Sequence, residues 1–382
     1  MKIGFDAKRA YHNSTGLGHY SRTLIRSLAT DYPENEYMLF TPSVSDLFHT
    51  ASYPNVHAYM PVATAGKLFP KNWRNRGIIA DLQKEGVQLY HGLSHQIPVG
   101  IKESGIASVV TIHDLIFERY PGQHGKVNVL LYRKKFKYAC KNADIVIAIS
   151  QQTKQDLIDL YHVPENKIRI CYQSCDPVFS KKINEEEKKI TRAKYDLPEK
   201  FFLSVGSITE RKNLLTVCRA IKRRKTDLPL VVIGTGRKYK KKLQEYLKKN
   251  DLVQQVIFLS DHPEAASAGF RSSTDFPAIY QSAAALLYPS LFEGFGIPIL
   301  EALESGLPVI TSNVSCMPET GGDAALYIDP FDDKALAEKM RIVAEDQTLA
   351  AAMVEKGYAH AKKFSPGKCA AAVMNVYKEL VQ

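Results

Sequence analysis

The sequence predicts an open α/β protein built from two Rossmann-like, doubly wound domains. Short β-branched or aromatic runs recur along the 382 residues, and each is followed by a polar, helix-like stretch. The runs are apolar almost throughout, which is typical of strands buried on both faces of a parallel sheet. This rhythm stops once, in the stretch after Asp176-Pro177, where charged residues dominate up to residue 200. Since charged, solvated linkers separate domains, the interruption predicts a boundary.

The expected strands follow in order, five on each side of the interruption. They are residues 2–6, 37–40, 89–92, 108–114, 144–150, 201–206, 228–234, 256–260, 284–290 and 307–312. We therefore expect a first Rossmann-like domain over 1–178, a linker over 179–200, and a second Rossmann-like domain over 201–364. The segment 365–382 is expected as a helix that packs back on the first domain, because Ser365-Pro366 resembles a cap followed by a proline at the first helical position.

Composition narrows the class of protein. With 45% hydrophobic and 24% charged residues the chain is neither disordered nor fibrous. The net charge of +11 favours partners that carry negative charge, namely phosphate-bearing small molecules, acidic lipid surfaces or nucleic acid. The six cysteines show no zinc or disulfide spacing, and neither a secretory signal nor an 18-residue apolar run is apparent. We expect a cytoplasmic protein with reduced thiols and no membrane span.

The stretch 288–311 predicts a strand, a glycine loop, a short helix and a further strand. Gly294 and Gly296 let the backbone approach a ligand closely, Pro298 suits a first helical turn, and Gly306 is placed to end the helix. Free N–H groups at such a helix start form an anion site, most often for phosphate. We expect ligands beyond the carboxyl ends of the strands, in the loops after 201–206, 228–234 and 284–290, within a cleft between the domains.

Two acids frame this loop. Glu293 belongs to the loop, and Glu301, eight residues later, belongs to the helix. A carboxylate at Glu301 has two possible roles. It accepts two hydrogen bonds from a ribose diol, as in dinucleotide-binding folds, or it only complements the helix dipole.

A second element lies in residues 201–213. A strand is followed by a turn at Gly206-Ser207, and Arg211 and Lys212 come just before a helix. Two cations at a helix start make a clamp for a diphosphate. The alternative is a solvated pair of cations on a surface turn.

The amino-terminal half offers weaker signals. Gly16 and Gly18 precede a helix, but their spacing lacks the nicotinamide fingerprint GxGxxG. His113 and Asp114 follow a strand, which places an imidazole at its carboxyl end. The alternative is a histidine that only caps the strand.

Taken together, these motifs resemble the E-x7-E signature of the retaining glycosyltransferases of family 4, which have the GT-B fold. The residues that carry the resemblance are Glu293, Gly294, Phe295, Gly296, Pro298, Glu301, Ala302, Gly306, Pro308 and Val309, with Arg211-Lys212-Asn213, the Gly16–Gly18 loop and His113-Asp114 in the same order. The resemblance implies catalytic roles for His113, Arg211, Lys212 and Glu293. It implies donor binding by Gly16, Gly206, Ser207, Gly294, Phe295, Gly296, Ile297 and Glu301, and it leaves Gly18 and Asp114 as candidates on the acceptor side.

The resemblance implies that the domain over 1–178 binds the acceptor and that the domain over 201–364 binds the nucleotide-sugar. It also implies a mechanism. The acceptor attacks from the face that the leaving diphosphate vacates, and the diphosphate takes the acceptor proton. No DxD-like pair is apparent, so we expect no metal and no other cofactor beyond the nucleotide-sugar substrate. Residues 312–330 resemble the mannosyltransferase branch, which makes GDP-mannose the expected donor.

Two features depart from the family pattern. Ser207 stands where many members carry a basic residue, so Arg211 and Lys212 must neutralise the diphosphate with less help. Residues 261–275 are longer than the usual turn and form either a mobile flap or a surface insertion.

The expected acceptor is a glycan or a lipid-linked oligosaccharide of surface polysaccharide synthesis, such as lipopolysaccharide. A basic and aromatic stretch favours contact with an acidic membrane surface from the cytoplasmic side, although a solvated helix face is the simpler interpretation. Its members are Leu130, Leu131, Tyr132, Arg133, Lys134, Lys135, Phe136, Lys137, Tyr138 and Lys141. A sugar-nucleotide epimerase of the same fold is the second candidate function. Nucleic acid is not expected as a partner, because the basic residues form no recognition module.

Overall fold

The chain folds into two compact units, each with one parallel sheet. The computed structural model describes residues 1–62, 64–123, 125–223 and 226–381. The first unit comprises Met1–Cys175 and Phe364–Gln382, and the second comprises Asp176–Lys363. Each unit is described by itself below.

The first unit contains a seven-stranded sheet over the described residues, with the strand order β3-β2-β1-β4-β5-β6-β7. All its pairings are parallel. Its strands are β1 (Lys2–Asp6), β2 (Glu36–Phe40), β3 (Val56–Tyr59), β4 (Leu89–Gly92), β5 (Ala107–Ile112), β6 (Ile145–Ala148) and β7 (Ile168–Ile170). Its helices are α1 (Lys8–His12), α2 (Gly16–Asp31), α3 (Thr64–Leu68), α4 (Pro70–Asn72), α5 (Ile78–Lys84), α6 (Ile116–Arg119), α7 (Lys126–Asn142), α8 (Gln151–Tyr161) and α18 (Pro366–Leu380), with a π-helical turn at Trp73–Gly77.

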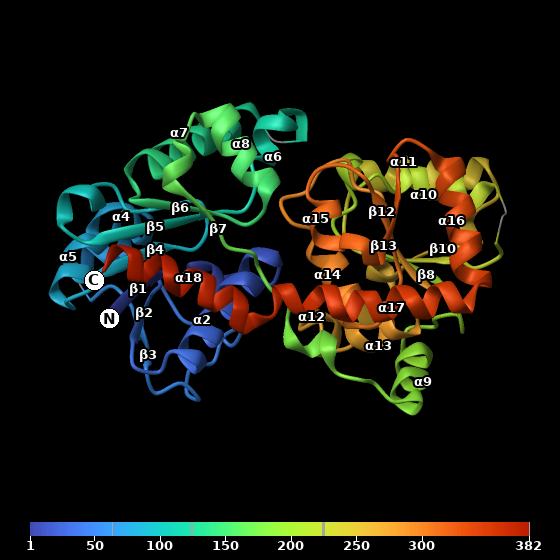
Figure 1. Cartoon of the computed structure of the whole chain (residues 1–382), viewed down its shortest axis with the longest axis horizontal. Helices are drawn as coiled ribbons and strands as arrows, with labels where there is room; N and C mark the ends of the chain where they lie inside the picture. The colour runs from blue at the N-terminus through green and yellow to red at the C-terminus, as the bar shows by residue number, and fades with distance from the viewer. Residues whose placement is uncertain (63, 124, 224–225, 382) are drawn as a thin grey trace. The chain divides into compact units, whose positions relative to one another are not determined.

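Helices cover both faces of this sheet (Figure 1). Apolar residues of α2 and α18 pack on one face, and those of α5, α7 and α8 pack on the other. The final helix α18 is thus part of the first unit. Its Tyr377 is fully buried, and the hydroxyl lies 2.6 Å from Nδ1 of His91 on β4.

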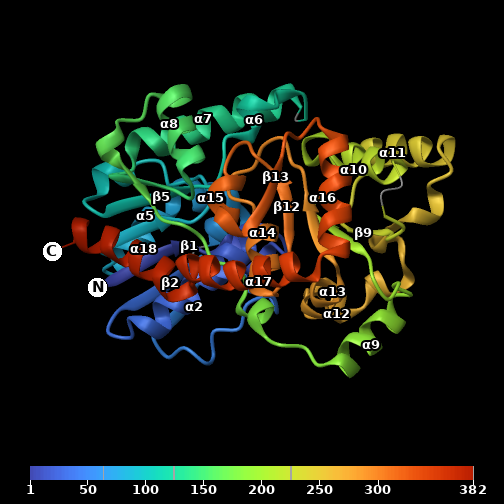
Figure 2. The same ribbon diagram turned by 45° about the vertical axis from the view of Figure 1, so that its right-hand side comes forward.

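The second unit contains a six-stranded parallel sheet over the described residues, in the order β10-β9-β8-β11-β12-β13. Its strands are β8 (Phe202–Val205), β9 (Leu230–Ile233), β10 (Val256–Phe258), β11 (Ala285–Tyr288), β12 (Val309–Ser312) and β13 (Ala325–Ile328). Its helices are α9 (Glu185–Lys194), α10 (Leu214–Lys222), α11 (Lys238–Lys249), α12 (Ala268–Arg271), α13 (Phe276–Ser282), α14 (Ile297–Glu304), α15 (Met317–Gly321), α16 (Asp333–Glu345) and α17 (Gln347–Ala361). Figures 1 and 2 both show α10, α11 and α16 on one side of this sheet and α13 and α17 on the other.

The segment 179–200, which the sequence predicts as a linker, differs from that expectation. It carries helix α9 and belongs to the second unit. Helix α9 has no buried residue, which accounts for its charged composition, but Tyr195 directly after it is fully buried. The hydroxyl of Tyr195 donates a 2.6 Å hydrogen bond to Asp275. The boundary between the units falls at Cys175–Asp176.

The order of strands reverses once in each sheet, between β1 and β4 and between β8 and β11. In open α/β sheets, ligands bind beyond the carboxyl ends of the strands at such a reversal. The loops after β1, β4, β8 and β11 are therefore the places where a ligand of each unit is expected.

Candidate functional site

Two loops at the strand reversal of the second sheet bring together the acid and the cations predicted from the sequence. Arg211 and Lys212 follow β8 in a 3₁₀ turn, and Glu293 lies in the loop after β11. Arg211 Nη1 lies 2.6 Å from Glu293 Oε1, and Lys212 Nζ lies 2.7 Å from the same oxygen. We call these three residues the ion cluster. The alternative of a solvated surface pair is wrong, since Arg211 is only 9% exposed.

The charges of the ion cluster do not balance. Burial acts to raise the pKa of Glu293, but Lys212 and Arg211 outweigh it and lower that pKa to about 2. Glu293 is therefore ionised at neutral pH and faces two cationic side chains. Burial lowers the pKa of Lys212, and the nearby Arg211 acts in the same direction. A bound anion such as a phosphate would offset the positive charge left over.

Backbone contacts fix the Glu293 loop in place. Arg211 donates from Nη1 to the carbonyl of Phe292 at 2.5 Å, and the carbonyl of Arg211 accepts from Leu291 N at 2.8 Å. On the other side, the Ser315 hydroxyl donates to the carbonyl of Glu293 at 2.9 Å. The two loops of the site are thus held together independently of any ligand.

Gly206 makes room for Lys212. Its φ is +135°, and a Cβ at this position would lie 3.1 Å from Cε and 3.2 Å from Nζ of Lys212. The end of β9 supports the same turn, because Gly206 N donates to the carbonyl of Ile233 at 2.9 Å. Ser207 is exposed beside it. The turn predicted at Gly206-Ser207 is confirmed, and only a glycine fits its first position without strain.

The glycine loop and helix predicted over 288–311 are confirmed. Gly296 has a φ of +88° and precedes α14, which begins at Ile297, while Gly306 has a φ of +67° just after the helix. Phe295 is buried, and its carbonyl accepts a hydrogen bond from Thr320. Gly294 lies between Glu293 and Phe295 in the same loop. The start of α14 therefore lies next to the ion cluster, as an anion site at a helix terminus requires.

Glu301 lies further along α14 and is held by a tyrosine. The hydroxyl of Tyr280, on α13, donates to Glu301 Oε2 at 2.6 Å. Burial raises the pKa of Glu301 to about 7, and the nearby Asp176 acts in the same direction, whereas the Tyr280 hydrogen bond lowers it. Glu301 is therefore poised between its charged and neutral forms near neutral pH.

In the first unit, helix α2 begins at Gly16, so the predicted glycines lie at a helix start. A Cβ added at Gly16 would contact nothing within 4 Å, but one at Gly18 would lie 1.7 Å from the carbonyl oxygen of Asn13. Close backbone packing therefore accounts for Gly18, whereas Gly16 has open space beside it. Asp114 caps the turn after β5, where its Oδ1 accepts from Ile116 N at 3.0 Å.

His113 directly follows β5 and is almost fully buried, at 4% exposure. Its Nε2 lies 2.9 Å from the carbonyl oxygen of Leu93, and its ring meets the edges of the Tyr20 and His95 rings. Burial lowers the pKa of His113 to about 3, and the nearby His95 acts in the same direction. The imidazole is therefore neutral at physiological pH and donates its Nε2 proton to Leu93.

The basic and aromatic stretch lies on α7 and is only partly available for a partner. Arg133 is engaged with Glu118 at 2.6 Å, and Phe136 is buried in the core. In contrast, Leu130 and Leu131 are 61% and 52% exposed. No helix in the described part of the chain is long and apolar enough to cross a membrane.

Residues 261–275, expected as either a flap or an insertion, belong to the second unit and are bound to neighbouring elements of it. Asp275 accepts from Lys194 at 2.8 Å in addition to Tyr195, and Asp261 pairs with Lys240 on α11. The insertion is therefore attached at both of its ends.

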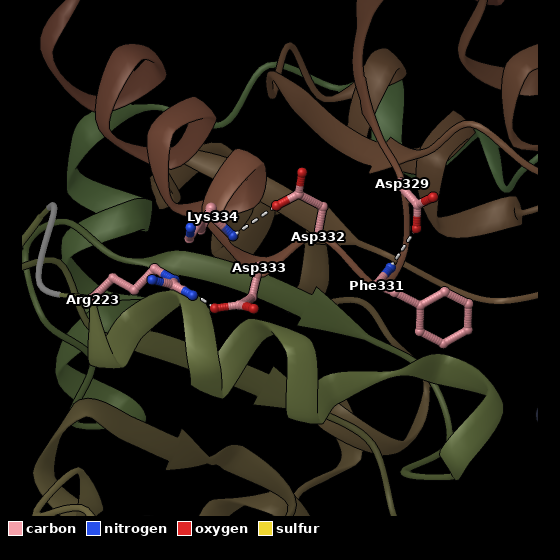
Figure 3. A pocket seen from close by; sticks show the side chains of 6 residues that line it. All are labelled: Arg223, Asp329, Phe331, Asp332, Asp333 and Lys334. Atoms are coloured by element: carbon pink, nitrogen blue, oxygen red, sulfur yellow. Dashed lines mark hydrogen bonds and ion pairs between the residues drawn. The ribbon is translucent and has the colours of Figure 1, made fainter.

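A shallow hollow of about 370 Å³ opens beside α16, away from the predicted residues. Figure 3 shows that its charged side chains serve local contacts, such as the ion pair of Arg223 with Asp333 and the contact of Asp332 with Lys334. Phe331 at its rim is 73% exposed. We assign no function to this hollow.

The sequence did not predict two side-chain contacts of the candidate site. Tyr280 holds Glu301, and the Tyr288 hydroxyl accepts a hydrogen bond from Lys212 at 2.5 Å. In both cases the two partners are far apart in the sequence. The one indication in the sequence is that both tyrosines lie in or just before β11, which leads into the glycine loop. Over the described residues, no group of three His, Cys, Asp or Glu side chains is arranged to hold a metal ion.

Comparison with known families gives two matches that together span most of the chain. Residues 14–178 match the model described as Glycosyltransferase Family 4. Residues 184–360 match the model described as Glycosyl transferases group 1. The division between the two matches falls close to the boundary between the two structural units.

Curated relatives carry related names. The chain is 26% identical to O-antigen chain mannosyltransferase B of Escherichia coli, over 100% of both chains. It is 29% identical to O-antigen chain mannosyltransferase RfbU of Salmonella typhimurium, over 59% of this chain and 58% of the relative.

Solved structures share the fold. A glycosyltransferase of Rickettsia africae matches with a TM-score of 0.73 and 16% identity, over 100% of this chain and 98% of the other. Anabaena HepE in complex with UDP matches with a TM-score of 0.73 and 15% identity, over 99% and 100%. WaaG, a glycosyltransferase involved in lipopolysaccharide biosynthesis, matches with a TM-score of 0.68 and 18% identity, over 98% and 99%. With its two family matches and its two parallel-sheet units, this chain belongs to the family 4 glycosyltransferases and has the GT-B fold.

Proposed function

We propose that this glycosyltransferase transfers mannose from GDP-mannose, with retention of configuration, to a glycan or lipid-linked oligosaccharide of a surface polysaccharide. The observation that carries the proposal is the ion cluster, which joins Arg211, Lys212 and Glu293 at the strand reversal of the second sheet. The names of the two O-antigen mannosyltransferases support the choice of sugar and of pathway.

In this proposal the second unit binds the donor. Arg211, Lys212 and the first N–H groups of α14 hold the diphosphate, because cations and a helix terminus both favour phosphate oxygens. Glu301 accepts hydrogen bonds from the ribose hydroxyl groups, and its place on the same helix supports this role. Gly206 and Gly296 allow the backbone to approach the donor.

The chemistry follows from the charges. When the bond from the sugar C1 to the diphosphate oxygen breaks, its electron pair stays on the diphosphate, and an oxocarbenium-like sugar develops. The fixed positive charge of Arg211 and Lys212 stabilises the negative charge on the leaving group. The acceptor oxygen forms its bond to C1 on the same face, and its proton passes to the diphosphate.

Glu293 is a poor nucleophile in this proposal. Its carboxylate shares one oxygen with two cations and has a pKa of about 2, which favours a structural and electrostatic role. We further propose that no divalent metal is required, since the side chains of the chain itself provide positive charge for the diphosphate. Full activity in the presence of EDTA is the expected result.

The exposed apolar face of α7 supports attachment to an acidic membrane surface, where a lipid-linked acceptor would be found. Leu130 and Leu131 are exposed there, and Lys134 and Lys137 are exposed on the same helix. Apolar side chains flanked by lysines are typical of helices that bind anionic lipids from one side.

A thermal-shift comparison of GDP, UDP, ADP and dTDP sugars tests the donor. A ligand that binds only the folded protein raises the melting temperature, and GDP-mannose is expected to give the largest rise. A shift with UDP sugars alone would contradict the choice of GDP-mannose. Product analysis by NMR then reports the anomeric configuration, and an inverted product would contradict the retaining mechanism.

A further inference from the structure

A group of basic side chains lies at the strand reversal of the first sheet, outside the residues assigned so far. β1 ends at Asp6, and α1 begins two residues later with Lys8 and Arg9. β1 and β4 are the neighbours between which the strand order reverses. This edge corresponds to the place where an open α/β sheet binds its ligand.

Arg74 joins this edge from the π-helical turn at Trp73–Gly77. Its Nε donates to Asp6 Oδ1 at 2.9 Å, and its Nη2 pairs with Asp6 Oδ2. Asp6 is only 1% exposed, so solvent does not reach the carboxylate that makes this two-oxygen contact. The buried acid holds the guanidinium at the edge of the sheet and is itself neutralised by it.

The loop after β4 connects this edge to helix α7. Gln96 in that loop hydrogen-bonds to Asn75, the neighbour of Arg74. His95 stacks on Phe136 of α7 with ring centroids 4.4 Å apart. Lys135 precedes Phe136, so these contacts bring the middle of α7 to the same edge.

Electrostatics agree with this placement. Burial lowers the pKa of Lys135, and the charged neighbours that add to the effect are Arg74, Lys71 and Arg9. Burial also lowers the pKa of Lys8, and the nearby charges of Arg74 and Arg9 lower it further. Like charges within such reach of one another disfavour the charged forms.

Few acids oppose these cations. Asp6 is the carboxylate among the charges that most affect the pKa of Lys8, and it is already paired with Arg74. In the ranges that the structure describes, no ion pair with a carboxylate is formed by Lys8, Arg9, Lys71 or Lys135. Arg9, Lys71 and Lys135 are exposed, so a ligand from solution can reach them. An ordinary solvated surface would mix both signs of charge more evenly.

The cluster also lies near His113. Arg9 is among the charges that lower the pKa of His113 and of His95. The imidazole that the resemblance assigns to catalysis and the basic edge therefore belong to one region of the first unit.

We propose that Lys8, Arg9, Lys71 and Lys135, with Arg74 fixed behind them, bind a phosphate or diphosphate group carried by the acceptor. Arginine and lysine together suit such a group, since one offers paired donors and the other a compact charge. The inference rests on the proposed function only in calling the ligand an acceptor. A phosphorylated sugar and a lipid diphosphate share this chemistry.

The test is isothermal titration of the full-length protein with geranyl diphosphate and, separately, with inorganic pyrophosphate. The double variant Arg9→Gln with Lys135→Gln removes two cations of the cluster. The matched control, Lys84→Gln with Lys102→Gln, removes two exposed cations of the first unit that are not part of it. Lys212→Ala provides the comparison for binding at the donor site of the second unit.

Hydrogen bonds to charged groups contribute about tenfold or more in affinity each. We therefore expect the cluster variant to bind geranyl diphosphate at least about tenfold more weakly than the wild type, and the control variant to bind within about twofold of it. Equal losses for both probes indicate recognition of the diphosphate itself, and a loss confined to geranyl diphosphate indicates a lipid-linked acceptor.

Unchanged binding by the cluster variant, or an equal loss in the control, would overturn the inference. A loss seen only in Lys212→Ala would overturn it as well, because the probe would then occupy only the donor site. Failure of the proposed donor function has a different signature, which is the absence of a thermal shift with nucleotide sugars while the cluster variant still loses diphosphate binding.

Discussion

Lys212 is the residue in which the packing and the chemistry of the proposed donor site meet. Its ammonium group contacts Glu293 and the Tyr288 hydroxyl, and its ring contact with Tyr288 places Nζ 4.5 Å from the ring centroid. These contacts fix the cation without a ligand present. A charge that is already positioned lowers a barrier more than a mobile one does, because no reorganisation is needed.

The substitution Lys212→Ala is expected to reduce turnover by about 10²- to 10³-fold, as loss of one fixed group that stabilises developing negative charge does. The measurement is steady-state sugar transfer, with the melting temperature recorded alongside. Lys241→Ala, an exposed lysine on α11, is the matched control and is expected to keep wild-type turnover. Equal turnover in the two variants would contradict the assigned role.

Glu301 predicts a pH dependence of donor binding. Its pKa of about 7 lies above the ordinary value, so the side chain is mostly protonated below pH 7 and mostly ionised above it. Ribose hydroxyl groups donate hydrogen bonds, which favour the ionised form. The KM for the donor is therefore expected to rise as the pH falls from 8 to 6.

The variant Glu301→Gln provides the check. An amide does not titrate, so the donor KM of this variant is expected to be higher at pH 8 and flat over the same range. A wild-type KM without a step near pH 7, or a variant that keeps the step, would assign the titration to another group.

At the scale of residues, the sequence predicted which side chains form the ion cluster but not how they contact one another. Arg211, Lys212 and Glu293 were all expected in the site, yet nothing in the sequence indicated that both cations share one oxygen of Glu293. Tyr280 escaped prediction altogether. Contacts between residues distant in the chain depend on loop geometry, which spacing alone does not determine.

At the scale of elements, the start of α2 offers a direct test of two predicted glycines. A Cβ at Gly18 would lie 1.7 Å from the carbonyl oxygen of Asn13, whereas one at Gly16 has open space. We expect Gly18→Ala to lower the melting temperature by several degrees, because the backbone of Asn13 must move, and Gly16→Ala to leave it unchanged.

The activity of Gly16→Ala then separates two roles for this position. Reduced transfer with an unchanged melting temperature is expected if the backbone of Gly16 lies close to a ligand. Full activity would remove Gly16 from the predicted donor-binding residues. A stable, active Gly18→Ala would contradict the close packing seen at the start of α2.

Strand prediction succeeded in the centre of each sheet but missed three of the four edge strands, β10 being the exception. All ten predicted runs are strands, but β3, β7 and β13 were not expected, and each of them is an edge strand. An edge strand is covered less completely, and the sequences of β3 (VHAY) and β7 (IRI) lack the continuous apolar run that marks a buried strand, whereas β13 (ALYI) is apolar throughout. β3, for example, has only one buried residue among its four.

At the scale of the whole molecule, the two-domain organisation could be predicted because parallel sheets impose a regular alternation along the chain. The extent of each domain was harder to predict. The charged segment 179–200 resembled a linker, although α9 merely has no buried face and Tyr195 anchors it to the second unit. Charge content reports solvent contact, which a linker and an exposed helix share.

The proposed membrane attachment concerns the whole molecule and gives a further prediction. The double variant Leu130→Ser with Leu131→Ser removes exposed apolar area from α7 and is expected to weaken binding to vesicles that contain phosphatidylglycerol. Ile190→Ser, which alters a 58% exposed residue of α9, is the control. Vesicle sedimentation measures both, and equal binding of the double variant and the wild type would remove α7 as the contact.

The central claim is that the second unit binds the donor diphosphate at Arg211 and Lys212 beside the start of α14. A crystal structure of the enzyme with GDP-mannose tests it most directly. The account predicts phosphate oxygens within hydrogen-bond distance of both cations and ribose hydroxyl groups at Glu301. A nucleotide bound elsewhere, with the ion cluster free of phosphate, would contradict it.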